Sequence, residues 1–116
     1  MKYEVIVTGL GDLVSDMLEG NIYILFNENA PAELAEISVL HTIAELKEAV
    51  KVGDKVTIGT LDYTVQDVGE EANHTLKSLG HCTLKFGVEK VDLPGEIALT
   101  GNPIAHVKPG DLIKIE

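Results

Sequence analysis

Short β-type segments separated by glycine-containing turns are the feature that most limits the possible folds of this chain. Turn signals recur about every eight to twelve residues, a spacing typical of small all-β domains. We therefore expect a mainly β protein, with about seven short strands in a small closed or nearly closed antiparallel β-barrel. Eight segments are candidates for these strands: residues 2–8, 22–26, 37–41, 55–58, 61–68, 81–86, 96–100 and 112–115.

Two or three short helices are expected beside the strands. Residues 12–18 place their apolar side chains on one helical face, and residues 31–36 begin with a proline, which suits the first turn of a helix. Residues 70–79 are acidic at their start and basic near their end, as the helix dipole favours. Gly80 is expected to end this last helix in the left-handed conformation.

A short pattern occurs twice in the second half of the chain. Residues 50–58 read Val-Lys-Val-Gly-Asp-Lys-Val-Thr-Ile, and residues 107–115 read Val-Lys-Pro-Gly-Asp-Leu-Ile-Lys-Ile. Each predicts a type II turn, with glycine at the position of positive φ, that leads into a strand. Two interpretations remain open: the barrel reuses one kind of turn, or the chain contains an internal duplication.

Length and composition exclude several classes of protein. A chain of 116 residues can form one hydrophobic core but not two, so we expect one domain over residues 1–116. The net charge of -10 disfavours nucleic acid and anionic membranes as partners. Cys82 is the only cysteine, which excludes a disulfide framework and a cysteine-based zinc site. No segment has the pattern of a membrane span or a signal peptide, so we expect a cytoplasmic protein.

His41 is the strongest candidate functional residue. It ends the candidate strand 37–41, and Thr42 with Glu45 forms a capping-box pattern that predicts a helix over residues 42–50. A helix dipole beside a buried ring favours the neutral, nucleophilic form of histidine, and free N–H groups in a first helical turn can bind phosphate. The alternative is that His41, like most histidines near helix starts, only forms a local hydrogen bond.

The segment 81–86 contributes a second candidate group. Alternation places Cys82 on the inner face, as a small core residue, and places His81, Thr83 and Lys85 together on the outer face. A histidine, a hydroxyl and a cation in one row can contact a phosphate, although three ordinary surface residues would give the same pattern. We expect His74 and His106 to be exposed. None of the four histidines is paired at ligand spacing, so we expect no metal site.

Several stretches resemble one protein family. They are Leu-Gly-His-Cys-Thr-Leu-Lys-Phe at 79–86, Asn-Ala-Pro-Ala-Glu-Leu at 29–34, and His41 followed by Glu-Leu-Lys at 45–47. Together they are similar to the glucitol/sorbitol-specific IIA component of the bacterial sugar phosphotransferase system. The resemblance covers nearly the whole chain. Some members carry a second histidine two residues after the first, where this chain has Ile43.

The resemblance implies a function and partners. Such a component is a small β-barrel that accepts a phosphoryl group from the carrier HPr on a histidine and passes it to a cysteine of the IIB component. The phosphohistidine falls on His41, with Thr42 and Lys85 as expected phosphate contacts and His81 as a supporting contact. The membrane partners would be the glucitol/sorbitol IIB and IIC components, and no cofactor is required. The alternatives are a barrel that binds a small acidic or sugar ligand without catalysis, and a regulatory module.

Overall fold

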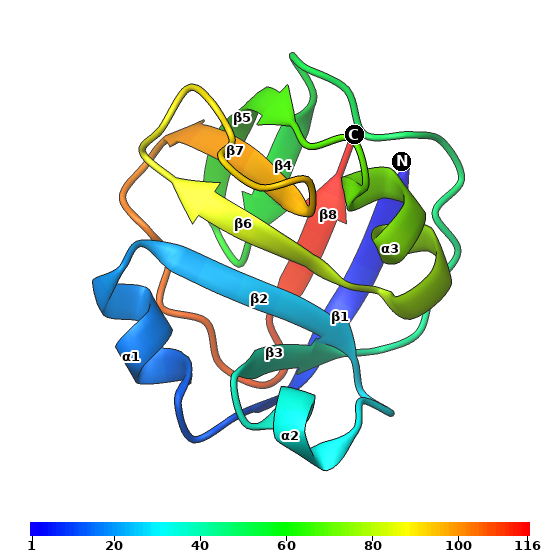
Figure 1. Cartoon of the computed structure of the whole chain (residues 1–116), viewed down its shortest axis with the longest axis vertical. Coiled ribbons are helices and arrows are strands. Elements are labelled where there is room, and N and C mark those ends of the chain that lie inside the picture. The colour runs from blue at the N-terminus through cyan, green and yellow to red at the C-terminus, as the bar shows by residue number, and fades with distance from the viewer.

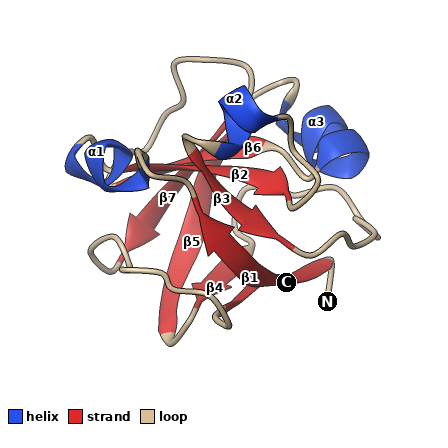
Figure 2. Ribbon diagram, turned by 90° about the horizontal axis from the view of Figure 1, so that it is seen from below, coloured by secondary structure: helices blue, strands red, loops and turns tan.

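The computed structural model describes all 116 residues as an eight-stranded closed barrel with three short helices on its outside (Figures 1 and 2). The strands follow one another around the barrel in the order β1-β3-β2-β6-β7-β5-β4-β8. This confirms the prediction of a small, mainly β barrel with short helices. The elements are β1 (Tyr3–Leu10), α1 (Val14–Glu19), β2 (Ile22–Asn27), α2 (Ala32–Ala35), β3 (Ser38–His41), β4 (Lys55–Ile58), β5 (Leu61–Val68), α3 (Ala72–Leu79), β6 (Cys82–Phe86), β7 (Glu96–Gly101) and β8 (Leu112–Ile115).

The barrel is not purely antiparallel, which corrects one part of the prediction. The pairs β2–β3 and β6–β7 are parallel, and the other six neighbouring pairs are antiparallel. Parallel neighbours need a crossover connection instead of a tight hairpin. Residues 28–37, which contain α2, and residues 87–95 provide these two crossovers.

The two halves of the chain fold alike. Exchanging β1 with β5, β2 with β6, β3 with β7 and β4 with β8 reproduces the same circular order of strands, read in the opposite direction around the barrel. A bulge interrupts β1 between Val7 and Gly9, and a matching bulge interrupts β5 between Val65 and Asp67. The barrel therefore has an internal pseudo-two-fold relation, and the repeated turn seen in the sequence is one part of it.

Backbone details repeat with the strands. The N–H group of Gly11 donates to the Ser38 carbonyl at 3.0 Å, and that of Gly69 donates to the Glu96 carbonyl at 2.8 Å. Asn21 follows α1 with a φ of 59°, and Gly80 follows α3 with a φ of 62°. The repeated turns also match, because Gly53 has a φ of 96° and Gly110 has a φ of 97°. The strands that follow these turns, β4 and β8, pair with each other.

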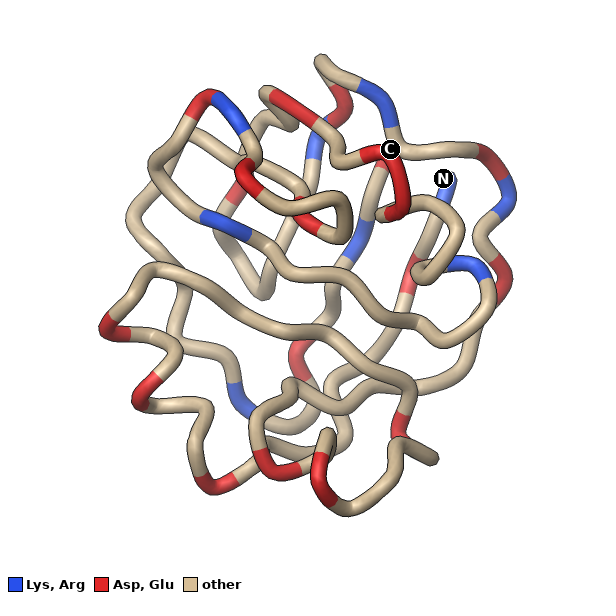
Figure 3. The backbone as a smooth tube through the Cα atoms, in the orientation of Figure 1, with Lys and Arg blue, Asp and Glu red and all other residues tan.

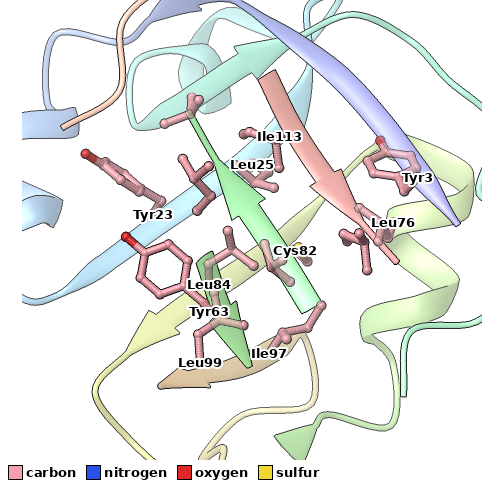
Figure 4. Close-up of a cluster of buried hydrophobic side chains, with 14 of the residues drawn as sticks. Tyr3, Tyr23, Leu25, Tyr63, Leu76, Cys82, Leu84, Ile97, Leu99 and Ile113 are labelled. Atoms are coloured by element: carbon pink, nitrogen blue, oxygen red, sulfur yellow. The ribbon is translucent and has the colours of Figure 1, made fainter. Parts of the chain in front are cut away.

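The core fills the barrel with inward side chains from all eight strands (Figure 4). Tyr23 and Tyr63 lie at one end of the drawn cluster, where their hydroxyl groups donate to the carbonyls of Ala105 and Pro103 and so hold the loop before β8. Cys82 is fully buried in this core, and burial raises the pKa of its thiol to about 12. The prediction that Cys82 is a core residue is confirmed.

The helix predicted over residues 42–50 is wrong. These residues form no regular secondary structure and run beside β1 as they connect β3 to β4. The N–H group of Thr42 donates to the carbonyl of Ile6 in β1, and that of Lys47 donates to the carbonyl of Lys2, just before β1. These hydrogen bonds take the place of the ones that a helix would have formed. A segment this short does not form a stable helix alone, and tertiary contacts decide its conformation. No helix in the structure has the length and hydrophobicity that a transmembrane helix requires.

Gly11 and Gly69 test the pseudo-two-fold relation, because each lies directly against backbone from the crossover in its own half. A Cβ on Gly11 would overlap the Ala35 and Glu36 carbonyls, and a Cβ on Gly69 would overlap the Pro94 carbonyl. We expect Gly11→Ala and Gly69→Ala each to lower the free energy of unfolding by about 2–3 kcal/mol in urea denaturation.

Gly95→Ala is the matched control for these two variants. A Cβ at Gly95 meets no atom within 4 Å, so this change should stay within about 0.5 kcal/mol of wild type. Equal stability of all three variants would show that the close approaches do not constrain the fold.

Candidate functional site

His41 is the last residue of β3 and is completely buried, with 0 % of its surface exposed. It alternates with Leu40 and therefore shares the inward face of β3 with Val39. In the register of the barrel it lies between Val7 on β1 and Asn27 on β2. The ring thus fills one end of the barrel interior, as expected for a histidine on an apolar strand face.

Both ring nitrogens of His41 face backbone carbonyls. Nδ1 lies 2.8 Å from the carbonyl oxygen of Thr42, and Nε2 lies 2.8 Å from that of Gly80. The rings of Tyr3 and His41 also pack in a T-shaped arrangement, with 6.2 Å between ring centroids. A neutral imidazole carries one N–H group, so it can donate to only one of the two carbonyls at a time. When the ring is neutral, one of its two nitrogens therefore faces a carbonyl oxygen without donating a hydrogen bond to it. That contact can be replaced by another partner.

Gly80 brings its carbonyl to the ring because it ends α3 in the left-handed conformation, as the sequence predicted. Its N–H group donates to the Leu76 carbonyl at 3.0 Å, which closes the helix before the chain turns into β6. A Cβ at this position would overlap Asn27 Oδ1 and would lie 2.7 Å from His41 Cε1. Both the positive φ and the lack of space therefore require glycine here.

Asn27 is the residue of this site that the sequence reasoning missed. It ends β2 and pairs with His41 in the parallel β2–β3 register. Its Oδ1 atom is buried and has no hydrogen-bond partner, which typically costs about 1–3 kcal/mol. The available signal was a polar residue directly after the apolar run 22–26, but such a residue also reads as the start of a loop.

Thr42 does not have the predicted role of a helix cap. Its Oγ1 accepts a hydrogen bond from the Ile6 N–H group at 3.0 Å, and its own N–H group donates to the Ile6 carbonyl at 2.9 Å. Thr42 thus fixes the end of β3 against β1 and directs its carbonyl to the His41 ring. The sequence pattern predicts that the free N–H groups of a first helical turn after Thr42 bind phosphate. Residues 42–50 form no helix, so this phosphate-binding site is absent.

His81 follows Gly80 but points to the outer face of the barrel. Its Nδ1 lies 3.0 Å from the Leu25 carbonyl, and its ring packs over Phe26 with 4.8 Å between centroids. His41 points inward, so the two rings lie on opposite faces of the sheet. His81 is therefore placed to hold the backbone next to Gly80.

The fold does not place Lys85 near His41. It pairs with Ile22, at the opposite end of β2 from Asn27, which is roughly 16 Å along the strand. Its ammonium group forms ion pairs with Asp92 and Glu96. The hydrogen bond to Asp92 raises the pKa of Lys85 above its usual value. The phosphate contact predicted for Lys85 therefore has no support in this geometry. His74 and His106 are exposed, as predicted.

The stretch of chain that contains His41 is acidic. No lysine or arginine occurs between Lys2 and Lys47, and Figure 3 shows several acidic positions on and beside α1 and α2. None of the residues that pair with or contact His41 is cationic. The acidic residues of this stretch are Glu4, Asp12, Asp16, Glu19, Glu28, Glu33, Glu36 and Glu45.

A sequence model of one known family matches this chain. Its description is "PTS system glucitol/sorbitol-specific IIA component", and the match covers residues 2–114. The chain belongs to this family. The glucitol/sorbitol-specific EIIA components of Shigella flexneri and of Escherichia coli K12 are each 35 % identical to it, over 98 % of this chain and 94 % of the relative.

A solved structure supports the same assignment. The PTS system IIA component from Enterococcus faecalis V583 superposes with a TM-score of 0.88 at 28 % sequence identity, covering 97 % of this chain and 98 % of that one. The resemblance seen in the sequence is confirmed. Membership of the IIA family implies a phosphotransferase role and interaction with other proteins of the phosphotransferase system.

Gly80→Ala tests the packing of this IIA site. We expect a loss of about 3 kcal/mol in the free energy of unfolding, because a left-handed alanine costs about 1 kcal/mol and the overlap with Asn27 and His41 adds the rest. The measurement is urea denaturation.

Gly87→Ala is the matched control. Gly87 has a φ of 76° and open space around it, so the same substitution should cost only about 1 kcal/mol. If the two variants were equally stable, the contact between Gly80 and the His41 ring would not be tight.

Proposed function

We propose that this protein is a phosphoryl carrier of the sugar phosphotransferase system and that His41 is its acceptor. It receives a phosphoryl group from phospho-HPr and passes it to the cysteine of a IIB component. The observation that carries the proposal is the orientation of His41, whose two ring nitrogens are both directed at backbone carbonyls in a IIA-family barrel. The names of the relatives support glucitol/sorbitol as the transported sugar and the IIB and IIC components as partners.

The two contacts of the ring support Nε2 as the nitrogen that reacts. Thr42 follows His41 directly, so its carbonyl stays close to Nδ1 and can keep the proton there. Gly80 belongs to the α3–β6 junction, a separate element that can move away from β3. Nε2 is then the nitrogen with the free lone pair, and it attacks the phosphorus atom. Because His41 is fully buried, we propose that the Gly80 carbonyl withdraws from Nε2 before transfer.

Each transfer exchanges one bond to phosphorus. In the first, the N–P bond to Nε2 of His41 forms as the N–P bond in phospho-HPr breaks, and the histidine of HPr leaves. In the second, the thiolate of IIB attacks, an S–P bond forms, and Nε2 of His41 leaves with its lone pair. The protein contributes position and hydrogen bonds to the phosphoryl oxygens, which is how most enzymes of this type lower the barrier. Neither step requires a metal ion or an organic cofactor.

His41 variants test the proposal. Incubation with radiolabelled phospho-HPr should add one phosphate to the wild type, which acid removes and alkali does not. His41→Gln should remove all labelling, and phosphorus on Nε2 should be visible by nitrogen NMR of the labelled wild type. The control His74→Gln changes an exposed histidine and should label normally.

Stability must be measured in the same experiment, because His41 is buried and makes two polar contacts. We expect His41→Gln to lose about 1–3 kcal/mol but to remain folded. Full labelling of the folded variant would overturn the assignment. Absence of labelling in the wild type would favour a binding or regulatory barrel.

For His81 we propose a supporting role through the backbone. Its hydrogen bond to Leu25 and its packing on Phe26 hold the strand next to Gly80. His81→Phe keeps the packing but removes the hydrogen bond, so acceptance should slow about tenfold while His41 remains the labelled residue. Thr83→Val, which changes the next outward residue of β6, is the control and should leave the rate unchanged. Loss of all labelling in His81→Phe, together with normal labelling in His41→Gln, would make His81 itself the acceptor.

A further inference from the structure

The barrel contains a polar pair where its own symmetry predicts an apolar one. His41 pairs with Asn27 across the parallel strands β3 and β2, and the corresponding pair in the other half is Leu99 with Phe86, across β7 and β6. The bulged strands confirm the equivalence, because Val7 pairs with His41 and Val65 pairs with Leu99. The fold therefore accepts two apolar residues at these positions, so the barrel itself does not require the carboxamide of Asn27.

Asn27 also has an unmet hydrogen bond. Its Oδ1 atom is buried without a partner, next to Gly80 and close to the His41 ring. Buried polar atoms are nearly always paired, so an unpaired one calls for an explanation, and a role in function is one such explanation. The carboxamide can rotate by 180° and present its NH₂ group in place of the oxygen.

A phosphoryl group on Nε2 needs hydrogen-bond donors. Its oxygens are acceptors with a charge near -2, and the nearest group to Nε2, the Gly80 carbonyl, is also an acceptor. No residue that pairs with or contacts His41 carries a positive charge. Two of these neighbours, Tyr3 and Asn27, have a buried polar atom without a partner. Of the two, Asn27 Oδ1 is the one that lies against Gly80, next to the side of the ring that faces it.

We propose that the carboxamide of Asn27 rotates and donates a hydrogen bond to the phosphoryl group on His41. This inference rests on the proposed function, because it needs a phosphoryl group at Nε2. The contact exists only when that group is present, which explains why Oδ1 has no partner in the free protein. The NH₂ group then stabilises the charge on the phosphoryl oxygens during both transfers.

Two substitutions of Asn27 separate this role from a structural one. Asn27→Asp keeps the size but replaces the donor with a negative charge, and Asn27→Leu removes the donor and the unpaired polar atom together. We expect the rate of labelling by phospho-HPr to fall roughly 100-fold in Asn27→Asp and about tenfold in Asn27→Leu. Asn27→Leu should be at least as stable as wild type in urea, since the other half of the barrel has Phe86 in this place.

The control is Asn29→Asp, which makes the same change of charge at an exposed residue of the adjacent loop. It should label within about twofold of wild type. A second readout is pH, because protonation of the introduced carboxylate in Asn27→Asp restores a donor. The deficit of this variant should shrink as the pH is lowered, which a purely structural defect would not show.

The outcomes distinguish the two proposals. If the wild type is not labelled, the carrier function fails and the role of Asn27 fails with it. If the wild type is labelled and both Asn27 variants match Asn29→Asp in rate, only the role of Asn27 is overturned. If Asn27→Asp does not fold, the rate and stability of Asn27→Leu decide the question.

Discussion

The pairing of each half of the chain with the other half is the constraint on which this barrel depends. β4 belongs to the first half but pairs with β5 of the second, and β8 belongs to the second half but pairs with β1 of the first. The halves also meet directly at β2–β6 and β4–β8. Neither half has a closed set of strands alone, so the backbone N–H and C=O groups of its edge strands are satisfied only in the complete barrel.

The candidate site arises where this repeat is broken. Equivalent elements place His41 and Leu99 at corresponding positions, and both halves bring a left-handed residue, Gly80 or Asn21, to the end of a helix. In one half the residues are apolar and complete the core. At the equivalent place, His41 and Asn27 of the first half meet the carbonyl of Gly80 from the second half in the same space. One framework thus supports a stable core on one side and reactive groups on the other.

The sequence predicted part of this site for sound physical reasons. His41 ends an apolar strand, Gly80 follows an amphipathic helix, and alternation places Cys82 inside, and all three follow from local periodicity and backbone preferences. The prediction of a helix after Thr42 failed because its capping pattern is local, whereas Leu46 and Val50 are buried by the barrel without a helix. The expected contact of Lys85 failed because alternation gives the face of a residue but not its distance from a site on another strand.

Local patterns in the sequence determined the strands, the short helices and their glycine ends, because these depend on neighbours within a few residues. The match of its motifs to a known family also pointed to His41. The tertiary structure alone decided that β2–β3 and β6–β7 are parallel, that the two halves are related by a pseudo-two-fold axis, and that Asn27 lies beside His41. These features depend on which distant segments pair. Pairing is set by the joint burial of side chains from all eight strands, and no single segment contains that information.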